Sequence, residues 1–123
     1  VFEIGGAALT TPEDGTGVTA TGGAITSLTS AALTTTNADD ILLYGCRWST
    51  TVSAVTPGSG YTIPANGNNT RIGMQYKIVS AIQSAVTTSM SWTTAANTCG
   101  LFMAFKQAPA GAGGPVLWAG GML

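Results

Sequence analysis

Short apolar runs separated by turn residues dominate this chain, and most of them alternate apolar and polar positions with a period of two. Three runs, 71–80, 86–92 and 100–106, place their larger apolar side chains on one face, as half-buried strands do. The run Ile41–Trp48 is almost entirely apolar, which predicts a central strand that is covered on both faces. The pattern therefore indicates β-structure along most of the chain.

Seven or eight such segments follow one another at a spacing of about 8–12 residues, with strong turn signals such as Pro57–Gly60 between them. This arrangement predicts an all-β fold, an antiparallel β-sandwich. One alternative is a short helix over 77–86, where three apolar residues lie four apart, but their β-branching favours a strand. The alternation places the rings of Trp48, Tyr76 and Trp92 on core faces.

The composition changes near residue 108. The segment 1–107 is predicted to form the sandwich domain, whereas the start of 108–123 is rich in Gly, Ala and Pro, which is typical of a flexible linker. A short apolar tail follows that is too small to fold alone. We expect this tail either to cover its own sandwich as a last edge segment or to insert into a neighbouring subunit.

Charged and titratable side chains are few among the 123 residues, which include four basic and five acidic residues, twenty threonines and no histidine. Without histidine, the usual group for proton transfer near neutral pH is missing, and a Ser–His or Cys–His pair cannot form. The formal net charge of −1 leaves little repulsion against self-association. We therefore expect a structural, non-enzymatic role with no cofactor.

Two classes of partner are also excluded by the sequence. Four scattered cations cannot build the basic stripe that neutralises a nucleic-acid backbone, so no nucleic-acid partner is expected. No run of about 18 apolar residues exists, so no membrane insertion is expected either. The sequence begins at Val1 without an initiator Met, which fits removal of a leader or origin from a longer polypeptide.

Two cysteines are too few for a disulfide framework and too few for a zinc site. In an oxidising compartment Cys46 and Cys99 could form one disulfide, which would stabilise the fold by roughly 3–4 kcal/mol. The alternative is two small buried hydrophobic residues. The pair Asp39–Asp40 could offer carboxylates to Ca²⁺, but adjacent side chains diverge on a strand, and we interpret the pair as a polar cap at the start of a strand.

One loop has the residue types of a glycan contact. Tyr61 lies close in sequence to Asn66, Asn68 and Asn69. Aromatic faces suit the apolar faces of pyranose rings, and Asn amides can both donate and accept hydrogen bonds to hydroxyls. These four residues are the candidate glycan contacts.

Four segments, in this order, resemble a Thr/Ser-rich β-sandwich module of phage virion and bacterial surface proteins. They are Val1–Gly6, Leu33–Gly45, Thr56–Thr62 and Leu101–Lys106, and the similarity covers roughly residues 1–107. The resemblance implies a jelly-roll-like sandwich that serves as a structural or adhesive module, with no catalytic motif. Modules of this kind usually have several more strands upstream, so the chain resembles the later part of one.

That difference from the module suggests an open sheet edge near the first strand, which another chain or an upstream segment completes by strand addition. Together with the apolar tail, this edge gives the predicted intersubunit contacts. They are Val1, Phe2, Ile4, Val116, Leu117, Trp118, Met122 and Leu123.

The sequence thus predicts a structural subunit of an extracellular assembly, found outside the cell or on a virion surface. A phage virion component such as a fibre, tail or capsid decoration protein is the first interpretation, with copies of itself or other structural subunits as partners. The alternative is a carbohydrate-binding or adhesive module of a bacterial surface protein or filament, with a cell-surface glycan as partner.

Overall fold

The computed structural model describes residues 4–8, 10–65 and 67–108 of the chain. The strands in this part are β1 (Glu13–Thr29), β2 (Asp39–Trp48), β3 (Thr56–Pro57), β4 (Ile72–Ser80) and β5 (Ser89–Lys106). The described residues contain no helix, and every pairing between these strands is antiparallel. The predicted all-β antiparallel fold is therefore confirmed, and the alternative helix over 77–86 is wrong.

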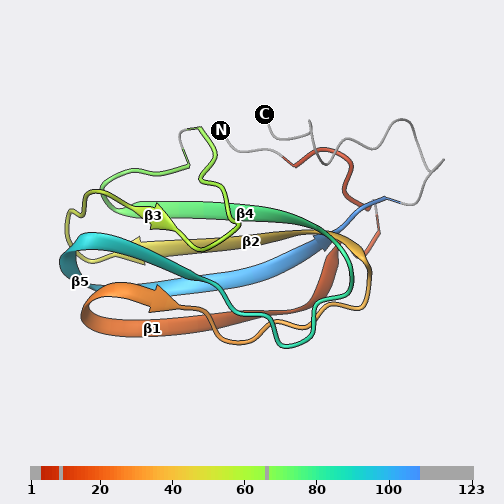
Figure 1. Cartoon of the computed structure of the whole chain (residues 1–123), viewed down its shortest axis with the longest axis horizontal. Coiled ribbons are helices and arrows are strands. Elements are labelled where there is room, and N and C mark those ends of the chain that lie inside the picture. The colour runs from red at the N-terminus through yellow and green to blue at the C-terminus, as the bar shows by residue number, and fades with distance from the viewer. Residues whose placement is uncertain (1–3, 9, 66, 109–123) are drawn as a thin grey trace.

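The five strands belong to one hydrogen-bonded sheet with the order β1-β5-β2-β4, and β3 pairs with β5 off this path. The two longest strands, β1 and β5, turn back on themselves at one end of the sheet (Figure 1). The first residues of β5 pair with the end of β1 and with β3, whereas its later residues pair with β2 and the earlier part of β1. One folded sheet thus makes both layers of the sandwich.

The turn in β1 is a β-bulge. Its register against β5 shifts between Gly22 and Ile25 and again between Ile25 and Ser27. Ala24 has a positive φ of 49°, and its backbone N–H donates to Asn97 Oδ1 at 2.8 Å. Bulges bend and twist a strand locally, which is what folding one strand into two layers requires.

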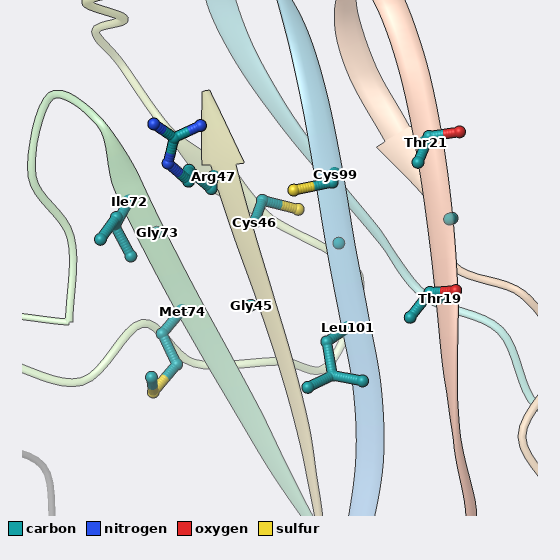
Figure 2. Close-up of a pocket in the computed structure, with 12 residues that line it drawn as sticks. Thr19, Thr21, Gly45, Cys46, Arg47, Ile72, Gly73, Met74, Cys99 and Leu101 are labelled. Atoms are coloured by element: carbon teal, nitrogen blue, oxygen red, sulfur yellow. The ribbon is translucent and has the colours of Figure 1, made fainter. Parts of the chain in front are cut away.

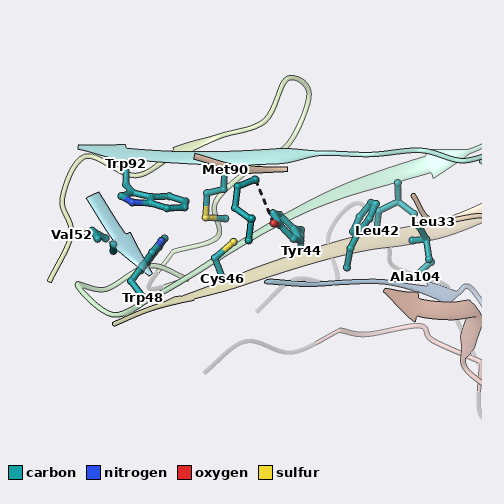
Figure 3. Packing of buried hydrophobic residues seen from close by; sticks show 12 residues of the cluster. Leu33, Leu42, Tyr44, Cys46, Trp48, Val52, Met90, Trp92 and Ala104 are labelled. Carbon is teal, nitrogen blue, oxygen red and sulfur yellow. Dashed lines mark hydrogen bonds between the residues drawn. The ribbon is translucent and has the colours of Figure 1, made fainter. Parts of the chain in front are cut away.

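The hydrophobic core lies between these two layers (Figure 3). Trp48 of β2 faces Trp92 of β5 with ring centroids 5.2 Å apart, and Trp92 Nε1 donates to the carbonyl of Ile25 at 3.0 Å. Tyr44 packs edge-on against Phe102 at 5.8 Å. The buried core cluster consists of Leu28, Leu33, Leu42, Tyr44, Cys46, Trp48, Val52, Met90, Trp92, Ala96, Phe102 and Ala104.

Two predictions about strands need correction. Seven or eight strands were expected, but the described residues form five, because a long strand that bends at a bulge carries turn-like residues in its interior. Tyr76 was expected in the core, but the buried positions of β4 are Gly73 and Gln75, so alternation puts half-buried Tyr76 on the opposite face. Trp48 and Trp92 are buried, as predicted.

Gln75 takes the core position because its amide is fully hydrogen-bonded. Gln75 Oε1 accepts from the backbone N–H of Gly58 at 2.8 Å, and Nε2 donates to Thr88 Oγ1 and to the carbonyl of Ser89. A buried amide with these partners avoids the cost of an unpaired polar group. The side chain fixes the segment that leads out of β3 against the start of β5.

Candidate functional site

The face of the sheet that points away from the core is apolar, and we call it the outer face. In β2, β4 and β5 it presents residues that alternate with core positions along each strand. These residues are Asp39, Ile41, Leu43, Gly45 and Arg47 in β2, Ile72, Met74, Tyr76, Ile78 and Ser80 in β4, and Cys99, Leu101, Met103 and Phe105 in β5. The charged residues among them are Arg47 and, at the start of β2, Asp39.

Much of this face is in contact with solvent. Ile72, Leu101 and Ile78 are 50%, 43% and 37% exposed, and they are three of the four exposed large hydrophobic residues in the part of the chain that the structure describes. Antiparallel sheets commonly carry polar residues on a solvated face. Contiguous exposed apolar surface instead marks an interaction site.

The sequence of β2 also indicates that part of the outer face lacks its cover. Its apolar run predicts cover on both faces, and its inner positions from Asp40 to Trp48 are buried. On the outer face Ile41 is buried, but Leu43 is only half-buried and Arg47 is exposed. The predicted cover on this second face is therefore incomplete among the described residues.

An open groove of about 480 Å³ crosses the outer face at Gly45 (Figure 2). The register places Thr19, Leu101, Gly45 and Met74 in one row across β1, β5, β2 and β4. Gly45 interrupts this row because it has no side chain between Leu101 and Met74.

A second row bounds the groove on one side, and it consists of Thr21, Cys99, Arg47 and Ile72. Arg47 brings a positive charge to the rim of an otherwise apolar hollow. The volume of the groove falls in the range of about 300–1,000 Å³ that is usual for ligand pockets.

The glycines of the groove have different roles. A Cβ added at Gly45 would meet only the carbonyl oxygen of Gly73 at 3.7 Å, which is ordinary contact, so this position opens outward. A Cβ at Gly73 would come within 2.5 Å of the Trp48 ring, and one at Gly100 within 2.6 Å of the Tyr44 hydroxyl. These two glycines allow close packing of the core below, whereas Gly45 creates the hollow above.

Both cysteines belong to the strand segments that border the groove, but their side chains point to opposite faces of the sheet. Cys99 pairs with Arg47 and shares its face of the sheet. Cys46 precedes Arg47 in β2, so its side chain points the other way, toward the core. Both are free thiols, Cys46 buried and Cys99 exposed, and the bridge considered from the sequence is not formed in this structure. Burial raises the pKa of Cys46 to about 11, which leaves it a protonated thiol at neutral pH.

A second polar feature, which sequence reasoning missed, is a buried carboxyl pair at the other end of the sheet. Asp14 of β1 and Asp40 of β2 are 2% and 0% exposed, and their side chains are in hydrogen-bonding contact. Asp14 accepts from the backbone N–H groups of Thr36 and Asn37, both at 2.7 Å, and from the Thr36 hydroxyl at 2.6 Å. Asp14 therefore fixes the loop that leads into β2.

The two carboxyls have opposite pKa shifts. Burial would raise the pKa of Asp14, but the hydrogen bonds from Thr36 and Asn37 outweigh it and lower the pKa below its ordinary value. Burial, reinforced by the neighbouring Asp14, raises the pKa of Asp40 to about 6. Asp40 Oδ2 is buried and accepts no hydrogen bond, so a proton on Asp40 that is donated to the Asp14 carboxylate satisfies both groups.

These carboxyls do not resemble a catalytic or calcium-binding pair. Neither lines the Gly45 groove or the second open hollow, which lies between the segment 4–8 and Phe105. Asp39 is exposed and Asp40 buried, so the adjacent pair diverges as expected. The described residues contain no group of three His, Cys, Asp or Glu side chains that could hold a metal ion.

The candidate glycan contacts do not form an open platform in the described part. Tyr61 is half-buried, its ring packs against Phe102 at 6.4 Å, and Lys77 Nζ lies 5.9 Å from its centroid. Asn69 Oδ1 accepts from the backbone N–H groups two and three residues ahead, and Asn68 is exposed next to β4. Asn66 lies outside the described residues, and the glycan contact stays a prediction.

The predicted intersubunit contacts fall mostly outside the described residues, since Val1, Phe2, Val116, Leu117, Trp118, Met122 and Leu123 are not described. Ile4 is half-buried and lines the second hollow with Pro12 and Phe105. The adjoining backbone pairs with the end of β5, where Ala7 is opposite Gln107 and Ala108 N–H donates to the carbonyl of Gly6. The first segment and the exit of β5 therefore lie together.

Comparison with known proteins gives no relative: no family model, curated protein or solved structure matches this chain. Among the described residues, no helix is long and apolar enough to cross a membrane.

Proposed function

We propose that this protein is a non-enzymatic structural subunit of an extracellular assembly, a phage virion component such as a fibre, tail or capsid decoration protein. The observation that supports the proposal is the outer face, where apolar side chains from three strands remain in contact with solvent. The virion assignment rests in addition on the resemblance of four chain segments to a virion β-sandwich module. In the assembly this face packs against a neighbouring subunit.

The energetics favour association through this face. Full burial of one Leu or Ile side chain contributes about 1.5–3 kcal/mol, and several residues of the outer face are available for it. Association of two proteins costs about 4–15 kcal/mol in lost translational and rotational freedom. Ile72, Leu101 and Ile78 have 37–50% of their surface left to bury on each copy, so the six side chains of two copies offset part of that cost. The small net charge adds little repulsion between copies.

The proposal is tested by sedimentation velocity across a range of concentrations, comparing the natural chain with Ile72→Glu. Ile72 lies opposite Arg47 on β2, so the new carboxylate gains a cross-strand partner and the fold is retained. A charge on the outer face must then be desolvated on association. We expect the natural chain to form a defined oligomer and Ile72→Glu to sediment as a monomer.

The matched control is Ile82→Glu, because Ile82 is 60% exposed and lies after β4, off the outer face. This variant is expected to assemble like the natural chain. A natural chain that stays monomeric at every concentration, or an Ile72→Glu variant that assembles normally, contradicts the proposal.

A further inference from the structure

The groove at Gly45 is the most specific feature of the outer face, and we propose that residues 116–118 of a second copy of this chain occupy it. The occupant is the apolar segment Val116, Leu117 and Trp118, which follows the linker. This inference rests on the proposed assembly function and adds to it a particular contact. The contact joins the tail of one subunit to the sheet of the next.

The groove has the chemistry that such a segment requires. Gly45 leaves a gap between Leu101 and Met74, so an inserted apolar side chain contacts aliphatic or thioether groups on both sides. In an extended segment Val116 and Trp118 point the same way, two residues apart. Adjacent rows of the sheet face offer the same spacing, because Gly45 and Arg47 also lie two residues apart on one strand.

Arg47 adds a specific partner for the aromatic ring. Its side chain is exposed at the rim of the groove and forms no ion pair with the described residues. A guanidinium above an indole face is a favourable cation–π arrangement, and it is stronger when both groups are shielded from water. The rim therefore suits Trp118 better than a purely aliphatic residue.

The length of the connection indicates a second copy rather than the same chain. The described part ends at Ala108, and Leu101 lies seven residues back along β5, or about 23 Å at 3.3 Å per residue. From Ala108 to Val116 there are eight residue steps, for which a Gly-rich chain has a root-mean-square span of about 14–17 Å. The chain's own tail reaches the groove only when nearly fully extended, whereas a neighbour's tail has no such restriction.

The area of the sheet face also indicates that an interface between two copies needs a contact besides the sheet itself. Four strands about 4.8 Å apart and about nine residues long present roughly 500 Å² per copy, or about 1,000 Å² for two copies packed face to face. Stable interfaces bury about 1,200–2,000 Å² in total. An inserted tail with one Trp adds about 150–250 Å² for that side chain alone, and the exchange of two tails brings the total into this range.

The experiment is disulfide trapping in the full-length chain with Ala119→Cys. Cys99 is exposed at the groove, and Cys46 is buried and protonated, so Cys99 is the natural thiol available to the tail. After mild oxidation, we expect covalent dimers and longer ladders on a non-reducing gel, with Cys99 joined to the introduced thiol in the cross-linked peptide. A mixture of ¹⁵N-labelled and unlabelled chains should give half of these peptides mixed labels. Ala119→Cys combined with Cys99→Ser should lose the ladder.

A second variant tests the groove without touching the tail. Gly45→Val fills the gap, and the space at Gly45 allows the added side chain without a backbone clash. We expect at least a tenfold drop in cross-linking yield from Gly45→Val in the Ala119→Cys background. The matched control is Gly23→Val, where an added Cβ meets only Asn97 Oδ1 at 3.6 Å and lies outside the groove. It should cross-link normally.

The outcomes separate the two proposals. If the chain assembles but the tail thiol bonds to Cys99 only within one chain, or if Gly45→Val cross-links as well as Gly23→Val, the tail contact is refuted and the assembly function stands. If the natural chain remains monomeric throughout, both proposals fail.

Discussion

The buried carboxyl pair makes the stability of this protein depend on pH, and one substitution removes the part of this dependence that comes from Asp40. Asp40 has a raised pKa of about 6, so the folded state holds its proton where the unfolded chain has already lost it. The stabilisation from Asp40 is complete below about pH 4 and is lost as the pH rises through about 6. Asp14, with its lowered pKa, stabilises above about pH 4 and loses that effect as the pH falls. Stability should therefore be greatest near pH 4 and fall as the pH rises from about 4 to about 6.

The substitution Asp40→Asn keeps a donor for Asp14 and removes the charge. The pKa shift from 3.8 to about 6 is roughly two units, and at 1.36 kcal/mol per unit the ionised Asp40 costs at most about 3 kcal/mol. Asp40→Asn should therefore exceed the natural chain in unfolding free energy at pH 8 by up to about 3 kcal/mol. At pH 4 the two proteins should differ little.

Urea unfolding at a series of pH values between 4 and 8 measures this difference directly. The control is Asp39→Asn, since Asp39 is adjacent but exposed and should leave the pH profile unchanged. A natural chain whose stability is flat across this range, or an Asp40→Asn profile that runs parallel to it, would refute the shared proton.

Four further substitutions test the packing, each by urea unfolding. Trp92→Ala should lower the free energy of unfolding by about 3–5 kcal/mol, because the ring is buried between the layers. Tyr76→Ala, on the outer face, should cost clearly less, and equal losses would mean that the two faces of β4 are wrongly assigned. Gln75→Leu should cost about 1–3 kcal/mol because the N–H of Gly58 loses its acceptor, and an unchanged midpoint would contradict the role of that amide. Gly73→Ala should destabilise by about 1–3 kcal/mol through overlap with the core ring below it, and a neutral result would contradict the close packing there.

Local alternation in the sequence was enough to locate the straight parts of the sheet. β2, β4 and the second half of β5 all coincide with predicted strands, and two of the three predicted core rings are buried. Tyr76 was misplaced because the more apolar face of β4 points outward, whereas the face with Gln75 and Lys77 points to the core, and alternation alone does not say which face is inward. The decisive fact is that Gln75 finds three partners on segments distant in sequence.

Long-range features could not be predicted in this way. Pro12–Gly15 has the composition of a turn, but in the structure Asp14 is a strand residue and Gly15 takes a φ of 73° next to a register shift. The partners of Asp14 lie more than twenty residues away, so no local pattern reveals its burial. The groove did leave a signal, since Gly45 interrupts an apolar run on the face opposite Tyr44. Only the paired strands show that the missing side chain opens a hollow.

The central claim is that the outer face is an interface between subunits, and methionine oxidation in the assembled and dispersed protein measures this most directly. Met74 and Met103 lie half-buried on the outer face, whereas Met90 is buried in the core and serves as an internal reference. Peroxide labelling followed by peptide mass spectrometry gives the oxidation rate of each. We expect Met74 and Met103 to be strongly protected at concentrations where the chain assembles and oxidised faster after dilution, with Met90 slow in both states. Equal oxidation of Met74 and Met103 in the assembled and diluted samples would contradict the claim.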